Sequence, residues 1–311
     1  MNYRTLLFFS FIACYTPAYA ESCWISGGNL NLGRANIQGS SIASTDISVN
    51  CNSNWNQTVS YKFCLVIDSI SPEGQDPRQM INYDHYPAPL LNYQLYYDAA
   101  RSNKISNSNT KSSAVCQTFK VAPNTGNPTS LIKLYGQVLA NQNPAAGYYK
   151  TNSVNMKLYY AYRYGLDAPS DLEALSNEQD IATNNLVVTT NYENSCLILT
   201  ASDIDFGSVE RLNSNLSGMG MIQLACPAGT NLKVSLDAGN NALGSQRRMR
   251  NILGHYLKYN LYQKPNYSTI WQANTTYSVT EQRIPVYAVV PAQSIQSIGK
   301  YSDTITITLT Y

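Results

Sequence analysis

Charged side chains are scarce in this sequence of 311 residues, and their charges nearly cancel. Asp, Glu, Lys and Arg make up 13% of the chain, and 21 basic against 19 acidic residues leave a formal charge of +2. Proteins that bind nucleic acid or an anionic membrane surface carry a clear basic excess, which this sequence lacks. We therefore expect no nucleic acid and no anionic membrane among its partners.

Histidine and the motifs of common enzyme and metal sites are also scarce or missing. Only two His occur, no Cys-x-x-Cys pair is present, and the spacing of zinc ligands is absent. The sequence has neither the Gly-x-Ser-x-Gly motif of hydrolases nor the His-Glu-x-x-His motif of metalloproteases. The acidic residues are scattered without a recognisable catalytic arrangement. We predict that the chain is not an enzyme and needs no cofactor and no metal.

Long hydrophobic runs are absent, but a short one lies near the amino terminus. Arg4 precedes the apolar segment 6–13, and Ala18-Tyr19-Ala20 is of the A-x-A type that signal peptidase cleaves. The segment is too short for a membrane anchor, which needs about 20 apolar residues. Residues 1–20 are therefore predicted to be a signal peptide, and Glu21 is the expected first residue of an exported chain.

Tyrosine, by contrast, is abundant, with 25 copies, and Asn, Ser and Thr are frequent. Such a composition is typical of β-rich extracellular proteins. Residues 304–311 alternate Thr with Ile, Leu and Tyr at a period of two, which is the pattern of a half-buried strand. Clusters of Asn, Gly, Pro and Ser separate similar runs elsewhere in the chain. The pattern predicts an all-β protein.

The two halves of the sequence resemble each other, and the matching segments follow in the same order. Cys23 and Cys51 have nearly the same spacing as Cys196 and Cys226. The further matches are Arg78-Gln79-Met80 with Arg248-Met249, His85-Tyr86 with His255-Tyr256, and segments 92–96, 134–138, 147–149 and 154–160 with 258–262, 286–290, 299–301 and 305–311. We therefore predict two copies of one domain, 21–160 and 192–311. Residues 161–191 are predicted to be a linker with one short helix and one strand.

The cysteines support an exported protein. Six of them remain when Cys14 leaves with the signal peptide, and an even number in an exported chain indicates disulfides. Two pairs occupy equivalent positions of the repeat, and the third pair consists of the two cysteines that remain. The expected disulfides are Cys23–Cys51, Cys64–Cys116 and Cys196–Cys226.

Each domain has one strand fewer than a complete sandwich requires. The second copy has strand patterns at 196–206, 219–226, 231–237, 257–263, 284–290 and 301–311. An immunoglobulin-like sandwich has about seven strands, and one that lacks a strand exposes an apolar groove that a partner's strand can cover. The count leaves open that a strand escaped detection or that the sheet tolerates an open edge. The predicted fold is two immunoglobulin-like β-sandwich domains, the C-terminal one lacking its last strand.

A series of motifs in the second half resembles one known family. They are Cys196, Asp205-Phe206-Gly207, Cys226-Pro227-Ala228-Gly229, Arg247-Arg248-Met249, 257–262, Val290-Pro291-Ala292, 299–304 and Tyr311. In this order they resemble the spore coat protein U domain, the pilin domain of archaic (Csu-type) chaperone–usher pili. The first half resembles it more loosely, since it adds Cys64, Cys116 and an insertion at 98–130 and has no acidic residue where Asp303 stands.

The resemblance implies a route of assembly and a location. In such pili a periplasmic chaperone lends the missing strand, and at the outer-membrane usher the N-terminal extension of the adjacent pilin subunit replaces it. The fibres mediate attachment and biofilm formation, so the chain is expected to be secreted through the periplasm to the cell surface. The terminal strand would face the chaperone or donor strand through Ile305, Ile307, Leu309 and Tyr311.

Two features match a tip adhesin in particular. The chain has two domains, and after cleavage only Glu21 and Ser22 would precede Cys23, so no strand is available for donation. A subunit that accepts a strand but gives none belongs at the pilus tip. A secreted structural coat or envelope protein and a non-tip pilus subunit are the alternatives, and the presence of chaperone and usher genes beside this one would separate the coat protein from the pilus subunits.

The surface-binding loops are predicted from the alternating direction of the strands. The last strand of the first domain, 149–160, is expected to end near the second domain, which places loops 33–44, 71–90 and 140–148 at the far pole. Exposed apolar residues there suit contact with hydrophobic or host surfaces. The alternatives are that Tyr86 and Leu90 pack in the core and that 144–148 only forms a turn. The candidate residues are Tyr83, Tyr86, Pro87, Ala88, Pro89, Leu90, Pro144, Ala145, Ala146 and Tyr148.

Overall fold

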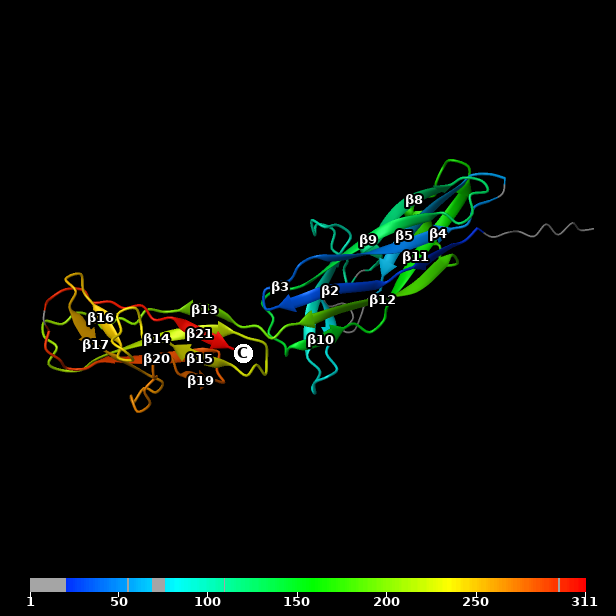
Figure 1. The fold of residues 1–311 in the computed structure, drawn as a ribbon. Helices are drawn as coiled ribbons and strands as arrows, with labels where there is room; N and C mark the ends of the chain where they lie inside the picture. Colours follow the sequence, from blue (N-terminus) through cyan, green and yellow to red (C-terminus); the bar gives the residue numbers. More distant parts are fainter. Residues whose placement is uncertain (1–20, 55, 69–75, 109, 296) are drawn as a thin grey trace, which may run out of the picture.

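The computed structural model describes residues 21–54, 56–68, 76–108, 110–295 and 297–311. The predicted signal peptide, residues 1–20, lies outside the described residues. The chain forms two β-sandwiches that lie end to end (Figure 1). In the described part of the chain, no helix has the length and apolar character needed to cross a membrane. The predicted all-β class with two sandwich domains is confirmed.

The first sandwich contains twelve hydrogen-bonded strands. They are β1 (Cys23–Ser26), β2 (Asn29–Asn36), β3 (Gly39–Ser40), β4 (Ala43–Cys51), β5 (Val59–Ile67), β6 (Arg78–Ile81), β7 (Leu90–Tyr96), β8 (Val115–Val121), β9 (Thr129–Val138), β10 (Gly147–Lys150), β11 (Val154–Tyr164) and β12 (Ile181–Tyr192). The order is β1-β4-β9-β7-β6-β10-β12-β11-β5-β8, and β2 pairs with β12 and β3. In this order, the strands from β1 to β10 form one layer, and β11, β5 and β8 form the other. β12 pairs with both β10 and β11 and so joins the two layers.

The pairing of β12 corrects the predicted linker. Its first half, from Ile181 to Leu186, pairs antiparallel with β11, and its second half pairs antiparallel with β10 and parallel with β2. The predicted boundary at residue 160 falls inside β11. Residues 161–191 are therefore part of the first sandwich. The sequence pattern revealed the strand, but its pairing depends on contacts far apart in the chain.

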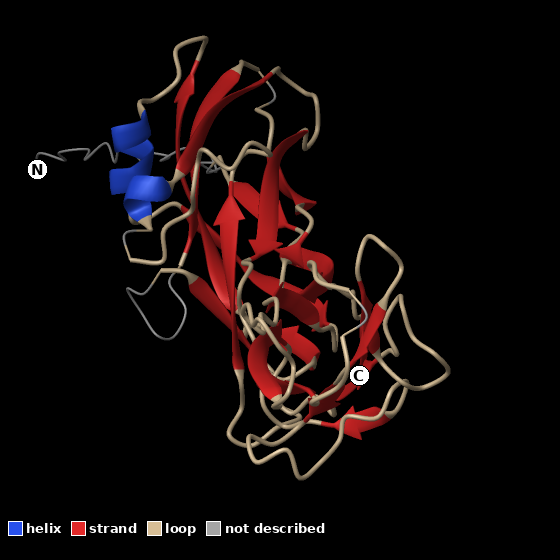
Figure 2. Ribbon diagram, turned by 90° about the vertical axis from the view of Figure 1, so that its left-hand side faces the viewer, coloured by secondary structure: helices blue, strands red, loops and turns tan. Residues whose placement is uncertain are grey.

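The predicted helix in this segment is confirmed as α1 (Asp171–Ser176). Ser170 caps it, since the backbone N–H of Glu173 donates to the Ser170 hydroxyl and the Glu173 carboxylate accepts from the Ser170 backbone N–H. The helix packs on the outside of β5 and β11 (Figure 2). This cover explains why β5 is buried on both faces, with an almost continuous apolar sequence. The other helix of the described residues, η1 (Lys111–Ser113), is a single 3₁₀ turn.

The second sandwich has shorter strands in smaller sheets. One sheet has the order β13 (Leu197–Ala201), β14 (Leu216–Ala225), β20 (Arg283–Val290) and β18 (Asn260–Tyr262). The other has the order β19 (Thr276–Ser278), β15 (Lys233–Leu236) and β21 (Ile307–Thr310), and β16 (Arg248–Arg250) pairs with β17 (Tyr256–Lys258). The strands predicted at 196–206 and 301–311 are both shortened, and the open groove described below gives the reason.

All three disulfides are present with the expected pairing. Two of them, Cys23–Cys51 and Cys196–Cys226, join equivalent positions in the two sandwiches. Cys64–Cys116 joins β5 to β8 and occurs in the first sandwich. In each sandwich the core consists of the residues that alternate inward, such as Ile47, Val49 and Cys51 on β4. The disulfides therefore lie at strand pairs that the core already holds in register.

Candidate functional site

The two sandwiches can be compared residue by residue through their strand registers. Met156 of β11 lies opposite Ile67, and Ile307 of β21 lies opposite Leu236. Leu158 and Leu309 are related in the same way one pair further along. β11 and β21 are therefore equivalent strands, as the sequence repeat predicts. The comparison leaves β12 as the strand of the first sandwich for which the described residues of the second offer no counterpart.

The missing strand leaves core positions of the second sandwich uncovered. In the first sandwich the side chains that β12 covers are at most 1% exposed; they are Leu30, Leu32, Val154, Met156 and Leu158. Their equivalents are only partly buried; they are Ile204, Phe206, Ile305, Ile307 and Leu309. We call these five residues the open groove. The predicted donor-facing residues Ile305, Ile307 and Leu309 thus lie together in it, and Tyr311 is 52% exposed at its end.

The backbone N–H and C=O groups that line the groove can also pair with an added strand. In the first sandwich Thr151 holds β12, since its N–H donates to Val188 O at 2.9 Å and its Oγ1 accepts from Val188 N–H at 3.0 Å. In the second, residues 202–206 and 303–306 adopt no regular strand. Thr304 and Thr306 accept hydrogen bonds from the β15 side, from Asn240 and Asp237. The opposite edge is free to pair with an added strand.

The core beside the groove is held by a buried arginine in each sandwich. The Arg247 guanidinium donates to the carbonyl oxygens of Leu236, Asp237 and Trp271. Arg78 does the same with the carbonyls of Ile67 and Asp68, so Arg78 corresponds to Arg247 and not to Arg248 as the sequence match indicated. Burial lowers the pKa of both guanidinium groups. The two arginines therefore hold equivalent strands of the two sandwiches in the same way.

Asp303 adds a contact that the first sandwich lacks. Its carboxylate accepts from the Tyr259 hydroxyl at 2.8 Å and from the backbone and side-chain nitrogens of Asn241 at 3.1 and 2.9 Å. Burial, followed by the hydrogen bond to Asp303, raises the pKa of Tyr259. These bonds hold the segment just before β21, which forms one wall of the groove. In the described part of the chain, no three His, Cys, Asp or Glu side chains gather to hold a metal ion.

The groove can hold one extended strand that runs antiparallel to β21. β12 shows what such a strand presents, because it fills the same place in the first sandwich. Its buried side chains alternate along the chain: Leu186, Val188, Thr190 and Tyr192. An occupant of the open groove therefore needs apolar or small side chains at every second position and free backbone groups on both edges.

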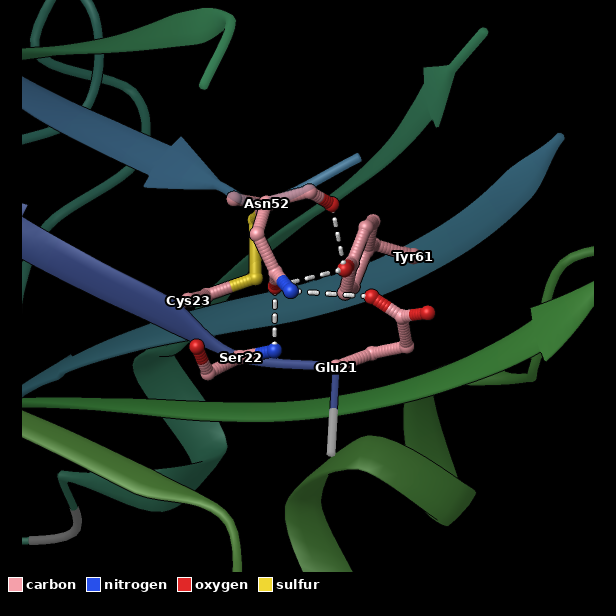
Figure 3. The surroundings of a disulfide bond; sticks show 6 residues. Glu21, Ser22, Cys23, Asn52 and Tyr61 are labelled. Atoms are coloured by element: carbon pink, nitrogen blue, oxygen red, sulfur yellow. Dashed lines mark hydrogen bonds between the residues drawn. A yellow bond between two sulfur atoms is a disulfide. The ribbon is translucent and has the colours of Figure 1, made fainter. Parts of the chain in front are cut away.

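The described N-terminal residues are bound to the first sandwich (Figure 3). Glu21 is 2% exposed, and its carboxylate accepts from the side-chain amides of Asn52 and Asn54 at 3.0 and 2.8 Å. The Ser22 N–H donates to Asn52 Oδ1, and the Tyr61 hydroxyl donates to the Asn52 carbonyl at 2.8 Å. Burial raises the pKa of Tyr61, and the nearby Glu21 carboxylate raises it further. Nothing in the sequence singled out Glu21 beyond its place after the predicted cleavage site.

The predicted surface-binding loops lie at the wrong pole. The 140–148 loop contacts the second sandwich, since Ala228 N–H donates to the carbonyls of Asn143 and Pro144 at 3.0 and 3.2 Å. Loop 33–44 lies at the same end, where Asn141 N–H donates to Ile37 O, and β3 is drawn beside the second sandwich (Figure 1). The direction of the strands was misjudged because β12 crosses the first sandwich once more before the chain leaves it.

Six of the ten candidate loop residues line a hollow between the two sandwiches. It has a volume of about 500 Å³ and is lined by His85, Tyr86, Pro87, Pro89, Pro144, Ala145, Ala146, Asn194, Ala228, Gly229 and Thr230. Tyr86 is fully exposed, and Tyr83, Leu90 and Tyr148 are about half exposed. The alternative that Tyr86 and Leu90 pack in the core is therefore wrong as well. Of the predicted 71–90 loop, residues 71–75 lie outside the described residues.

Another set of turns occupies the free end of the first sandwich, farthest from the second (Figure 1). Ser53 N–H donates to Gly126 O at 3.0 Å, and Gly165 N–H donates to Thr58 O at 2.8 Å. These bonds tie together the turns after β4, β8 and β11. The apolar side chains exposed near these turns are Tyr164, Leu166 and, on α1, Leu172. No sequence pattern pointed to these turns, because their position depends on β12.

The family comparison agrees with the repeat and the groove. The family model of the Spore Coat Protein U domain matches residues 10–156 and 182–308, which is most of the chain. The chain therefore belongs to the Spore Coat Protein U domain family. No curated protein matches the sequence.

Solved structures share the fold at low sequence identity. One is a chain from the CsuC–CsuE chaperone–tip adhesion subunit pre-assembly complex of the archaic chaperone–usher Csu pili of Acinetobacter baumannii. It is 17% identical with a TM-score of 0.51, over 93% of this chain and 100% of that one. A chain from a chaperone–tip adhesin complex of CFA/I fimbriae is 12% identical with a TM-score of 0.34, over 92% of this chain and 96% of that one. The first likeness shows a common fold over 93% of this chain.

Proposed function

We propose that this chain is a subunit of a chaperone–usher pilus and that its second sandwich takes up a β-strand from a neighbouring protein. The observation that carries this proposal is the open groove, whose equivalents in the first sandwich are covered by β12. Membership of the Spore Coat Protein U domain family and the likeness to a chain of a chaperone–tip adhesion subunit complex support it. A periplasmic chaperone would fill the groove first, and the adjacent pilin would replace it at the outer-membrane usher.

The finer proposal is a place at the pilus tip, on the cell surface. The first sandwich completes itself with β12 and so needs no strand from another subunit. Glu21 and Ser22 are hydrogen-bonded to Asn52, so they are not available to a neighbour. With the predicted cleavage before Glu21, the mature chain would receive a strand and donate none. The free end of the first sandwich would then point away from the fibre.

Adhesion and biofilm formation would rest on that free end. Leu166 in the turn after β11 is 70% exposed there, and Leu172 on the adjoining helix α1 is 75% exposed. Exposed apolar side chains at the outermost point of a fibre suit contact with hydrophobic surfaces. The loops around Pro87 and Pro144 do not serve in this proposal, because they face the second sandwich.

The test of the groove uses the chain's own β12 sequence. A synthetic peptide of residues 181–192 is added to the purified mature chain, and thermal unfolding is followed. We expect a second, higher transition as the second sandwich is completed, because the peptide buries several apolar side chains at about 1.5–3 kcal/mol each before entropy is subtracted. A peptide with Leu186→Ser and Val188→Ser is the control. Unfolding that neither peptide changes would contradict the proposal.

A further inference from the structure

Large apolar side chains are exposed at the end of the second sandwich farthest from the first. Ile252 and Leu253 in the turn between β16 and β17 are 98% and 68% exposed, and Ile298 is 89% exposed. The two turns lie together, since the backbones of Arg250 and Ser302 exchange hydrogen bonds of 2.9 and 3.1 Å. β16 and β17 are drawn at this end in Figure 1. We call residues 251–255, 295 and 297–299 the outer end.

The outer end has a counterpart in the first sandwich, as equivalent hydrogen bonds show. The Tyr301 hydroxyl donates to Ser297 O at 2.7 Å, and the Tyr149 hydroxyl donates to Ala145 O at 2.6 Å. Tyr149 and Tyr301 are matched by the sequence repeat. Counting from these pairs, Ile298 corresponds to Ala146 and Ile295 to Asn143.

The second turn of the outer end also has its counterpart. The side-chain oxygen of Asn251 accepts from His255 N–H at 2.8 Å, and that of Asn82 accepts from Asp84 N–H at 2.9 Å. A Cβ on Gly299 would lie near the Asn251 amide, as one on Gly147 would lie near the Asn82 amide. The Ile252–His255 turn therefore corresponds to the turn that begins at Asn82 and carries Tyr86 and Pro87.

In the first sandwich this end contacts the domain that follows β12, and Tyr86 stays exposed beside the contact. After Tyr192 the chain passes directly into the second sandwich, and the Ala228 N–H donates to the carbonyls of Asn143 and Pro144. The two domains share the hollow lined by Tyr86, Pro87 and Ala146 on one side and by Ala228–Thr230 on the other. A completing strand and the sandwich that follows it thus dock as one unit.

The direction of a strand in the open groove is fixed by the same comparison. β12 runs antiparallel to β11 and ends beside β10, at the end that faces the next domain. β21 runs toward the first sandwich, since Thr310 pairs with Lys233 close to the turn at 227–230, and the C-terminus is drawn between the sandwiches (Figure 1). A strand antiparallel to β21 therefore leaves the groove at the outer end.

We infer that the outer end is the docking surface for the folded domain of the subunit whose N-terminal strand fills the groove. This inference rests on the proposed function. The partner is a sandwich of the same kind, whose turn equivalent to Pro227–Thr230 covers Ile252, Leu253 and Ile298 and donates an N–H to the carbonyl of Ile295. Exposed basic residues beside the patch, Arg250 and Lys300, match a partner surface with acidic residues at its rim.

The experiment is site-specific photo-crosslinking in assembled pili. Ile307 in the groove and Ile252 at the outer end are each replaced by p-benzoylphenylalanine, and linked peptides are identified by mass spectrometry. We expect Ile307 to link to a neighbour's N-terminal segment and Ile252 to link to the same neighbour, in its turn equivalent to Pro227–Thr230. Leu166, at the free end of the first sandwich, is the control position and should link to neither.

The outcomes separate the two proposals. If the Ile307 position links to no N-terminal segment of another subunit, the proposed function fails. If that link forms but Ile252 links to no subunit, or to a subunit other than the strand donor, the proposed function stands and the docking surface is refuted. A link from Ile252 to the chaperone alone would also refute it.

A second measurement does not depend on crosslinking. Pili carrying Ile252→Ser with Leu253→Ser should release this subunit in denaturant about tenfold faster, because two apolar side chains no longer gain from burial at the contact. Leu166→Ser with Leu172→Ser removes equally exposed side chains at the opposite end and should leave the release rate unchanged. Equal rates for the two variants would overturn the inference.

Discussion

Two buried arginines, Arg78 and Arg247, occupy equivalent positions in the two sandwiches. Arg247 is 4% exposed and Arg78 is fully buried, and each guanidinium donates to backbone carbonyls of the neighbouring strand. Leaving such buried carbonyls without a hydrogen-bond donor would lower the free energy of unfolding. The sequence match paired Arg78 with Arg248, which is one residue away from Arg247. The two adjacent arginines can be told apart only by their contacts.

Arg247→Lys tests this role. A lysine cannot reach the carbonyls of Leu236, Asp237 and Trp271 together, so the free energy of unfolding of the second sandwich should fall by about 1–3 kcal/mol. The measurement is the denaturant midpoint in the presence of the 181–192 peptide. Arg250→Lys, at an exposed arginine of the same region, should change it by less than about 0.5 kcal/mol. Equal losses for the two variants would show that the carbonyl contacts do not matter.

Buried tyrosines make the first sandwich sensitive to alkali. Burial raises the pKa of Tyr149 and of Tyr192 to about 12, above the ordinary value of 10.0. The folded state therefore holds these protons more tightly than the unfolded state. Their contribution is fully present below about pH 10 and is lost as the pH rises toward about 12. We expect the free energy of unfolding to fall over this range, and Tyr149→Phe with Tyr192→Phe to make the fall shallower. An identical slope in the double variant would contradict the assignment.

At the scale of single elements, the sequence predicted most strands and the helix α1. Alternating residues such as Ile47 and Val49 identify inward positions by themselves, and Ser170 with Glu173 marks a helix start. The sequence could not place β12, because the run that ends at Tyr192 pairs with strands far away in the chain. Because β12 was not placed, the predicted loops were assigned to the wrong end of the first sandwich. The prediction of the groove did not depend on β12, so the groove was foreseen.

The importance of β12 for the first sandwich can be measured directly. Leu186→Ala should lower the free energy of unfolding of this sandwich by about 2–5 kcal/mol, because Leu186 is fully buried between the two layers. Asn191→Ala changes an exposed residue of the same strand and should have little effect. Chemical denaturation followed by the first sandwich's tyrosine fluorescence reports the difference. A mild effect of Leu186→Ala would mean that 161–191 is a linker after all.

The groove strand β21 offers a similar matched pair. Ile307 faces the groove and Thr308 faces outward, although the two are neighbours. Ile307→Asp should weaken binding of the 181–192 peptide by about 10- to 100-fold, since a carboxylate would have to be buried against the incoming strand. Thr308→Asp should leave the peptide's dissociation constant within about threefold, because its side chain stays in solvent. Comparable losses for both would place the peptide outside the groove.

At the scale of the whole molecule, one sandwich is complete and the other is open. The complete one presents its free end, and the open one presents the groove and the outer end. In the proposed function, adhesion and assembly therefore belong to opposite ends of the chain. It also means that substitutions at the two ends should affect different steps.

Attachment of cells to a hydrophobic surface tests that assignment. Leu166→Ser with Leu172→Ser should reduce attachment without reducing the number of pili, because both side chains are exposed at the free end. Tyr86→Ser with Leu90→Ser, near the hollow between the sandwiches, should leave attachment unchanged. Pili are counted in parallel by electron microscopy. Loss of attachment in the second variant alone would restore the loops around residue 87 as the binding surface.

The double role of β12 has a mechanical consequence. The strand that completes the first sandwich is also the segment that leads through Tyr192 into the second. If the chain links a surface to a fibre as proposed, tension between the two sandwiches enters the first one along β12. Because the pull lies along the strand, its hydrogen bonds to β2, β10 and β11 share the load at once and do not open one by one. In the proposed function, the strand that bears the force is thus hydrogen-bonded to three other strands of the first sandwich.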